Sequence, residues 1–561
     1  MRALGRYAPL AALVAAQLVV VLLAPSKPVV RAAGGGAVGY TPGAGPTTGA
    51  TGGTAGSGAI TGAGPSATSQ GNRAVGGGGG TGTIGPAAEA GLPPGDTSHC
   101  RHGQQWDVGL TETPAPPCVP KWGGGNNGGA TSMGVTRTSI EVVYYREKDN
   151  PVVAQIEKAD NLYSDPNDQR AFLAKAFKFV NTYDQFYGRL IHWDFFQGQC
   201  SPAPPDPSCY RNDAKRLVGA LHPFAVIYDN NTNAPAFFDQ LSRLGVVNWG
   251  GWAFSDQFDD AHRPFHWDVF MGGDKQAEIT GEWYCKKLAN KKAKFSGERD
   301  LKLLTRKAAI IFPDVDVNRQ SAQHLDDIIN RCQPGGAGLY PYSPDTTTAA
   351  EQATTNVNKE KAAGITTLLW FSDPIAPIYG TKQQTSQQWF PENVIVGSGL
   401  LDYAPLAQLY DQHQWAHAFG PSDLVDAQPF SQTDAAKVWR MEGGSGDPYT
   451  SANLPWAYVN GIAGGLQMAG PSLTPYTYEH AMLTLPAWGG WQLSHHNPYA
   501  YYIKFGPGDY TAFSDQREVY WDPNLTSPSN GRKGEYVGLH SGERYRPGDW
   551  TTGDPQIPPS V

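Results

Sequence analysis

From about residue 134 onward, segments with the hydrophobic pattern of a strand alternate with segments in which hydrophobic residues recur at helical spacing. Residues 139–145 (SIEVVYY) are β-branched and aromatic, which is typical of a buried strand, and apolar residues then recur at helical spacing over 168–187. The same analysis predicts strands at 190–196, 224–228 and 246–249, with helices at 212–221 and 235–244 between them. Strands that alternate with helices indicate βαβ units and a parallel sheet covered on both faces. We therefore expect an α/β lobe over residues 134–273.

The pattern then restarts. Strands are predicted at 307–312 (KAAIIF), 338–342, 365–371 (ITTLLWF) and 393–396, and helices at 274–290, 318–331 and 347–363. These elements predict a second open parallel-sheet lobe over residues 274–399. The glycine-rich segments 272–273 and 397–399 lie where the chain is expected to cross between the lobes, and residues 400–487 are expected to return between them.

The first 97 residues of the sequence have a different composition from the rest. Residues 1–32 carry Arg2 and Arg6 ahead of an apolar run and read as a signal peptide, with an uncleaved membrane anchor as the alternative. Residues 33–97 are rich in Gly, Ala, Thr, Ser and Pro, a composition typical of a disordered linker. We expect an extracytoplasmic protein, either secreted or tethered to the outer face of the cell membrane.

Charge and cysteine content narrow the class further. The formal net charge is −8, which argues against nucleic acid as a partner because phosphate binding needs clustered cations. Six cysteines in an exported chain favour three disulfides, with metal binding as the less favoured alternative. Proximity in the sequence pairs Cys100 with Cys118 in a 98–133 extension, Cys200 with Cys209, and Cys285 with Cys332.

The order of elements resembles that of a known family. The segments that carry the resemblance are Gly134-Val135-Thr136, Lys215 to Val218, Phe224 to Ile227, Gly245 to Val247 and Ala308 to Ile311. Over about residues 134–480 the chain resembles type I periplasmic binding proteins of the leucine/isoleucine/valine-binding kind. The resemblance implies two Rossmann-like lobes joined by a hinge, a small-molecule ligand held in the cleft between them, and a membrane ABC permease as partner.

Candidate ligand-binding residues follow from the rule that ligands bind beyond the carboxyl ends of parallel strands. In the first lobe the resemblance places a polar loop at Asn230, Asn231 and Thr232, although helix capping by Asn231 or Thr232 is the alternative. The next such loop holds Trp252 and Ser255. Trp252 either forms an apolar wall for the ligand or packs beneath its own loop.

The second lobe offers polar residues after three strands. They are Asp314 and Asp316, Ser372 and Asp373, and Ser398. Asp373 is the best candidate partner for a ligand amino group, because a buried ammonium needs an anion. The sequence departs from the family at two places. Residues 397–399 lack the acidic residue that the family has there, and the loop that begins at Arg146 is charged. Arg146 or Lys148 is a candidate for contacting a ligand carboxylate, with solvated loop charges as the favoured interpretation.

Enzyme motifs are absent from the sequence. There is no G-x-S-x-G nucleophile elbow, P-loop or H-E-x-x-H motif. The pairs His262/His266 and His413/His417 have i,i+4 spacing but lack a third ligand nearby, so we expect no metal. Glycoside hydrolases use a pair of carboxyl groups, so Asp259 and Asp260 leave a glycoside hydrolase as a less favoured alternative. We predict no catalytic residue and no cofactor.

The aromatic-rich C-terminal extension at 488–561 has hairpin-like strands near 517–521 and 535–539. It is expected to pack along both lobes, with a carbohydrate-binding platform as the alternative. The function expected from the whole sequence is an extracytoplasmic, monomeric solute-binding protein that captures a small polar or amphipathic molecule (amino-acid-like, amide or carboxylate) and delivers it to an ABC permease. A secreted or surface-anchored sensor is the other non-enzymatic alternative.

Overall fold

The first lobe is built on a five-stranded parallel sheet. In this computed structural model, which describes residues 95–113, 115–202, 204–228, 234–397, 399–489 and 497–558, the strand order is β2-β1-β3-β4-β5. The strands are β1 (Ser139–Arg146), β2 (Leu190–Gln197), β3 (Ala225–Tyr228), β4 (Val247–Gly250) and β5 (His266–Trp267). The helices of this stretch are α2 (Pro151–Ala159), α3 (Pro166–Tyr183), α4 (Pro207–Leu221), α5 (Pro235–Arg243) and α6 (Asp256–Ala261).

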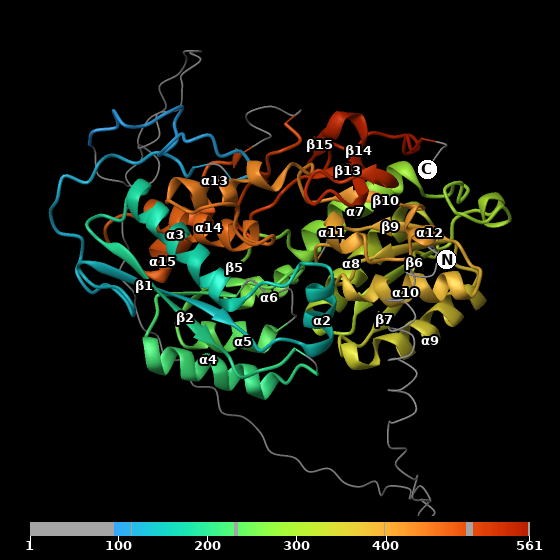
Figure 1. The fold of residues 1–561 in the computed structure, drawn as a ribbon, viewed down its shortest axis with the longest axis horizontal. Helices are drawn as coiled ribbons and strands as arrows, with labels where there is room; N and C mark the ends of the chain where they lie inside the picture. The colour runs from blue at the N-terminus through green and yellow to red at the C-terminus, as the bar shows by residue number, and fades with distance from the viewer. Residues whose placement is uncertain are drawn as a thin grey trace, which may run out of the picture. The chain divides into compact units, whose positions relative to one another are not determined.

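Both faces of this sheet are covered by helices. Val142 and Tyr144 of β1 belong to the apolar cluster that contains α3, whereas the alternate residues Val143 and Tyr145 pack with α4 and α5. Figure 1 shows the two helix layers on opposite sides of the sheet. Because successive side chains of a strand point to opposite faces, a sheet buried on both faces requires the continuous apolar run seen in β1.

The second lobe carries a mixed sheet in the order β14-β13-β10-β9-β8-β6-β7, with β15 also paired to β13. Its parallel strands are β6 (Ala308–Pro313), β7 (Gly338–Tyr342), β8 (Thr367–Trp370), β9 (Glu392–Ile395) and β10 (Ala418–Ser422). Its antiparallel strands are β13 (Gln516–Thr526), β14 (Lys533–Gly538) and β15 (Arg544–Tyr545). The helices are α7 (Gly273–Lys287), α8 (Asp316–Cys332), α9 (Ala349–Ala362), α10 (Ile375–Ser386), α11 (Ala404–Ala407) and α12 (Gln412–Trp415).

The chain crosses between the lobes three times. The first crossing, at Gly272 between β5 and α7, lies where the glycine pair predicted it. The second comes after β10, because β10 pairs with β9 and so extends the second sheet beyond residue 399, where the sequence pattern ended it. The chain then adds α13 (Asp434–Met441), α14 (Asn453–Met468), α15 (Pro475–Thr484) and the small pair β11 (Trp488–Gly489) and β12 (Tyr502–Ile503). Helices α13 and α14 pack on α3 of the first lobe before β13 returns to the second lobe.

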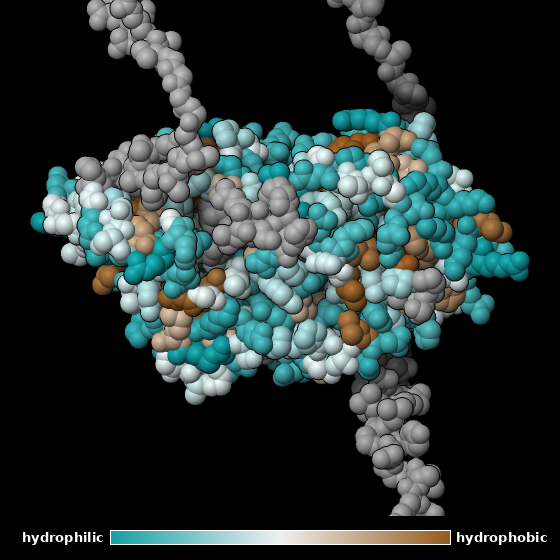
Figure 2. Space-filling view, turned by 90° about the horizontal axis from the view of Figure 1, so that it is seen from above, coloured by the Kyte–Doolittle hydropathy of each residue, from teal (hydrophilic) through white to brown (hydrophobic). Residues whose placement is uncertain are grey.

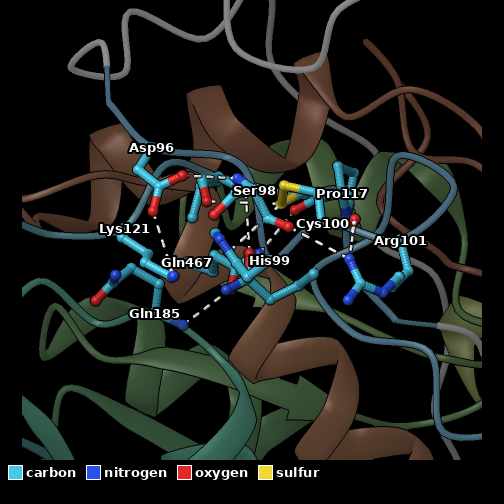
Figure 3. Close-up of a disulfide and its surroundings, with 12 residues drawn as sticks. Asp96, Ser98, His99, Cys100, Arg101, Pro117, Lys121, Gln185 and Gln467 are labelled. Carbon is cyan, nitrogen blue, oxygen red and sulfur yellow. Dashed lines mark hydrogen bonds and ion pairs between the residues drawn. A yellow bond between two sulfur atoms is a disulfide. The ribbon is translucent and has the colours of Figure 1, made fainter.

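The N-terminal extension is fastened to the first lobe. The carboxylate of Asp434, at the start of α13, accepts hydrogen bonds from the backbone N–H groups of Thr111, Glu112 and Thr113 at 2.8–2.9 Å. Gln467 of α14 donates to the carbonyl of Pro117 and accepts from the N–H of Gln185, as Figure 3 shows beside the nearby disulfide. The extension is therefore part of the folded body.

All three disulfides expected from the sequence form. They are Cys100–Cys118, Cys200–Cys209 and Cys285–Cys332, with Cα–Cα distances of 5.7, 5.7 and 5.6 Å. The third joins the last turn of α7 to the end of α8, and so clamps together the two helices on one face of the second sheet. Disulfides of this kind form and persist mainly in oxidising environments.

A thiol titration checks this pairing. We expect no free thiol in the protein after unfolding without reductant, and six after unfolding with reductant. Six reactive thiols without reductant would show that the bridges do not form.

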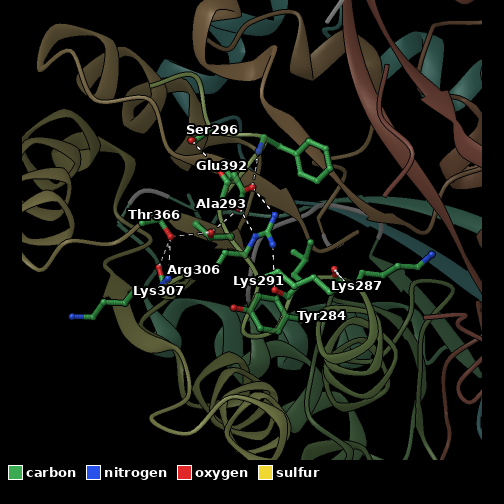
Figure 4. Close-up of polar contacts among 12 residues, drawn as sticks. Tyr284, Lys287, Lys291, Ala293, Ser296, Arg306, Lys307, Thr366 and Glu392 are labelled. Carbon is green, nitrogen blue, oxygen red and sulfur yellow. Dashed lines mark hydrogen bonds and ion pairs between the residues drawn. The ribbon is translucent and has the colours of Figure 1, made fainter. Parts of the chain in front are cut away.

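A buried ion pair joins the amino ends of two central strands in the second lobe. Arg306 is 4% exposed and Glu392 is fully buried, and the guanidinium donates to both carboxylate oxygens at 2.7 and 2.8 Å. Figure 4 shows Arg306 beside Glu392. Thr367 of β8 and the N–H of Phe295 also donate to Glu392. A bidentate pair with satisfied neighbours compensates for much of the desolvation of both charges.

Removing one partner of this pair should be costly. We expect Glu392→Gln to lower the free energy of unfolding by about 3–5 kcal/mol, because Arg306 would be left buried without its anion. Glu351→Gln, on the exposed first turn of α9, is the matched control and should change it by less than about 0.5 kcal/mol. Urea unfolding of the two variants measures this, and similar midpoints would contradict the role given to the pair.

Candidate functional site

A cavity of about 290 Å³ lies between the two lobes, beyond the carboxyl ends of their parallel strands. Arg146 ends β1, Trp252 follows β4, Pro313 ends β6 and Asp373 follows β8, and all four line this cavity. We call it the cleft. Its remaining lining includes the start of α10, the segment 400–409, residues 450–454 and the helix α2.

Trp252 is a wall residue of the cleft. Its side chain is 2% exposed and belongs to the large apolar cluster of the interior, yet it also lines the cavity. Packing beneath its own loop, one of the two alternatives, is therefore what the structure shows, and a role as a wall for the ligand stays a prediction. The indole packs beneath its loop and presents an apolar surface to the space between the lobes.

Ser255 has a structural role outside the cleft lining. Its hydroxyl caps α6 by accepting from the N–H of Phe258, and it donates to Gln320 of α8 in the other lobe. The side chain is 1% exposed. Ser255 thus joins the lobes beside the cleft instead of facing a ligand.

In the second lobe the structure separates the four acidic and hydroxyl candidates that it describes. Asp373 lines the cleft. Ser372 lies fully buried next to it, and its hydroxyl donates to the carbonyl of Asp373. Asp314 instead forms an exposed ion pair with Arg319, and Asp316 lies exposed at the start of α8. Neither Asp314 nor Asp316 is brought to the cleft. The remaining candidates, Asn230, Asn231, Thr232 and Ser398, lie outside the described residues.

Asp373 is held firmly in place. One carboxylate oxygen accepts from the hydroxyl of Tyr342 at 2.5 Å, and the other accepts from the backbone N–H groups of Ile375 and Ala376. Burial raises the pKa of Asp373 above its ordinary value. The carboxylate therefore organises the first turn of α10.

The charged loop after β1 contributes more to the cleft than its sequence indicated. Arg146 is 7% exposed and donates to Gln169 and Asp149, each at 2.6 Å. The carboxylate of Glu147 turns inward and accepts from the hydroxyls of Tyr210 and Tyr228. Lys148 is exposed, lines the cleft, and has no side-chain hydrogen bond or ion pair within the described residues. Lys148 is thus a solvated charge, in line with the favoured interpretation of this loop, whereas Arg146 and Glu147 are buried.

Helix α2 was missed by the sequence analysis and forms one side of the cleft. Asn150 caps it by accepting from the N–H groups of Val152 and Val153, and Pro151 occupies its first turn. An Asn-Pro pair is a recognisable start signal for a helix. The Asn150 side chain also donates to Thr346 of the second lobe at 2.8 Å, and Ile156 packs against that lobe's apolar cluster.

The two histidine pairs and the acid pair lie elsewhere. His262 bonds to Asp239 and to the carbonyl of Phe258, and His266 bonds to Asn248 inside the first lobe. Asp260 accepts from Tyr510, and Asp259 is buried. Within the described ranges, the two groups of His, Cys and acidic residues close enough to share an ion both contain a disulfide, whose sulfurs are not free thiolates.

The surface drawn in Figure 2 is mainly hydrophilic, with apolar residues in small separate groups. Among residues that the structure describes, none of the helices combines the length and apolar character that crossing a bilayer needs.

Two solved structures with similar folds are solute-binding proteins of ABC transporters. One is the ABC-transporter solute-binding protein of Rhodopseudomonas palustris HaA2 in complex with p-hydroxybenzoic acid, with a TM-score of 0.51 and 12% identity over 73% of this chain and 98% of that one. A second, from R. palustris in complex with 4-hydroxybenzoate, has a TM-score of 0.50 and 11% identity over 73% and 98%. The fold is therefore that of type I periplasmic binding proteins, as the order of elements predicted.

Sequence comparison adds nothing to this likeness. No protein family model and no curated protein matches the sequence. At 11–12% identity the structural likeness concerns the fold alone.

Glu157 of α2 makes the cleft sensitive to pH. Burial, and after it the negative charge of Asp149, raises the pKa of this cleft carboxyl to about 7 from an ordinary value of 4.5. The folded protein therefore holds this proton more tightly than the unfolded chain does. This group lowers stability progressively as pH rises from about 4.5 to about 7.

Glu157→Gln should remove that loss. We expect the variant to melt at a higher temperature than the parent above pH about 7, and the difference to shrink as pH falls toward 4.5. Melting curves across this range measure it, with Glu351→Gln as the exposed control. A difference that grows toward acid pH would contradict the assignment.

Proposed function

We propose that this protein is an extracytoplasmic solute-binding protein whose cleft captures a small amphipathic molecule for delivery to an ABC permease. The observation that carries the proposal is the cavity of about 290 Å³ at the facing carboxyl ends of two parallel sheets. Open α/β sheets bind ligands at that edge, where loops and helix starts supply polar groups. Its work is binding and release, without a chemical step.

The lining indicates the ligand class. Apolar side chains, among them Trp252, Leu400 and Leu406, form much of the wall. Lys148 offers a cation that has no ion-pair partner among the described residues, and Asp373 and Glu157 offer carboxyls. The volume lies at the small end of the range for ligand pockets, roughly 300–1,000 Å³. A molecule with an apolar body and an anionic group next to Lys148 fits best, and amino acids and aromatic carboxylates belong to this class.

The location and the partner rest on separate support. The disulfides favour an oxidising exterior, and the first 32 residues read as an export signal or anchor. The two proteins of similar fold are solute-binding proteins of ABC transporters. We infer from these observations that the protein works outside the cytoplasm, with a permease as its membrane partner.

A ligand screen with a matched pair of variants tests the proposal. We expect a carboxylate from a panel of amino acids, benzoates, amides and sugars to raise the melting temperature. Lys148→Met should weaken its binding by roughly tenfold or more, because a charge-assisted hydrogen bond is lost. Lys359→Met, at an exposed position of α9, should leave the affinity unchanged. Isothermal titration calorimetry measures both variants.

Two outcomes would overturn the proposal. One is a protein that binds no small molecule of the panel but hydrolyses a glycan, which would favour the hydrolase. The other is a ligand whose affinity falls equally in both lysine variants, which would place it away from the cleft. Capture of a permease complex from membranes by the protein, against capture of a signalling protein, separates transport from sensing.

A further inference from the structure

Residues 291–307 form a surface loop of the second lobe between α7 and β6, and we call it the basic loop. Two backbone hydrogen bonds close its base, one between Arg306 and Lys291 and one between Ala293 and Leu304, each at 3.0 Å. Figure 1 shows this stretch, in yellow-green, projecting from the second lobe. The sequence analysis gave it no part in the function.

The loop is anchored to the body of the lobe at several points. Arg306 forms the bidentate pair with Glu392, which also accepts from the N–H of Phe295. The N–H of Gly297 donates to the carbonyl of Phe390 at 2.9 Å. Because these bonds hold the backbone, the exposed side chains of the loop are presented from a fixed support.

Two neighbouring leucines of the basic loop are exposed. Leu303 is 60% exposed and Leu304 is 49% exposed, whereas Leu301 of the same short turn packs against the apolar cluster of the lobe. A single exposed leucine is ordinary, but two adjacent ones on an anchored loop form an apolar pair that the fold leaves in water. Covering this pair would be favourable, so the loop favours a partner with an apolar component.

The same loop concentrates positive charge in a chain that is acidic as a whole. It contains seven Lys and Arg residues against Glu298 and Asp300, while the formal net charge of the chain is −8. Two acidic residues from outside the loop offset part of this charge. Glu392 pairs with Arg306, and Asp554 pairs with lysines 291 and 294. The basic loop therefore keeps an excess of cations.

Three of these cations are available to a partner. Lys292, Arg299 and Lys302 are exposed, and none of them forms an ion pair or a side-chain hydrogen bond with another residue that the structure describes. Net charge argued against phosphate-bearing partners for the whole chain because phosphate binding needs clustered cations. The basic loop supplies such a cluster locally.

Exposed cations beside exposed leucines are the combination that binds the interface of an anionic bilayer. The cations contact lipid phosphates, and the apolar side chains enter the boundary between headgroups and acyl chains. The sequence also supports a membrane nearby, because residues 1–32 read as an export signal or anchor. An acidic protein surface would satisfy the cations but gives no reason for the exposed leucines.

We propose that the basic loop docks the folded body onto an anionic membrane surface. Leu303 and Leu304 enter the interface, and Lys292, Arg299 and Lys302 contact lipid phosphates. This surface is separate from the cleft, since none of the five residues lines that cavity. It gives the second lobe a membrane contact of its own, in addition to any tether at the N-terminus.

Co-sedimentation with lipid vesicles tests this proposal. The chain from residue 33 onward is used, because the apolar run in residues 1–32 would bind lipid by itself, and the part of the chain that the structure describes begins at residue 95. We expect binding to vesicles of equal parts phosphatidylglycerol and phosphatidylcholine. The binding should weaken as salt screens the charges, and vesicles of phosphatidylcholine alone should bind little.

Two sets of variants separate charge from apolar contact. Lys292→Gln combined with Arg299→Gln and Lys302→Gln should weaken vesicle binding by roughly tenfold or more, because each cation near an anionic surface contributes to the affinity. Leu303→Ser combined with Leu304→Ser should weaken it by roughly tenfold. Lys359→Gln with Lys361→Gln, at exposed positions of α9, is the control and should leave it unchanged.

The possible results separate this inference from the proposed function. Binding lost in both sets of loop variants but kept in the control would support the docking surface. A folded protein that binds no anionic vesicle, or whose binding survives either set, would overturn it. Failure to bind vesicles together with loop-dependent binding of polyglutamate would also overturn it and assign the loop to an acidic protein. Ligand affinity of the cleft, measured by calorimetry, should be the same in all these variants.

Discussion

The direction of the central strands is the constraint on which the rest of this structure depends. In each lobe the five parallel strands must end at one edge of the sheet, because βαβ connections return every strand in the same sense. The two edges meet at a single cavity, so that Arg146, Trp252 and Asp373 line the same space although they are far apart in the chain. The site is therefore a consequence of topology, and the loops supply only its chemistry.

Additions at both ends of the chain modify this common architecture. The N-terminal extension is held by the carboxylate of Asp434, and the C-terminal strands continue the second sheet beyond β10. Together they contribute to the lining of a second cavity, of about 180 Å³, through the buried acids Glu112 and Glu535.

Much of the fold was predictable because its elements are locally encoded. Each strand of the α/β core that the sequence analysis proposed forms within a few residues of its expected bounds, since a strand buried on both faces must be continuously apolar. Helix α2 was missed although Asn150 and Pro151 signal its start, because its nine residues lie in a segment of charged appearance. The extension of the second sheet was missed because β10 and β13 pair across almost a hundred residues.

The residues of the candidate site were likewise predictable only in part. The rule that ligands lie after parallel strands selected Trp252 and Asp373, which reach the cleft, but also Ser255, Asp314 and Asp316, which do not. Residues in the loop after a strand point in different directions. Some of them cap a helix or form an ion pair instead of lining the cleft, as Ser255 and Asp314 show. Sequence alone determined the two α/β lobes, their cysteine pairs and the edge of each sheet at which the cleft lies, because periodicity and proximity are local properties. Only the tertiary structure decided which side chains face that space, because this depends on contacts between segments distant in the chain.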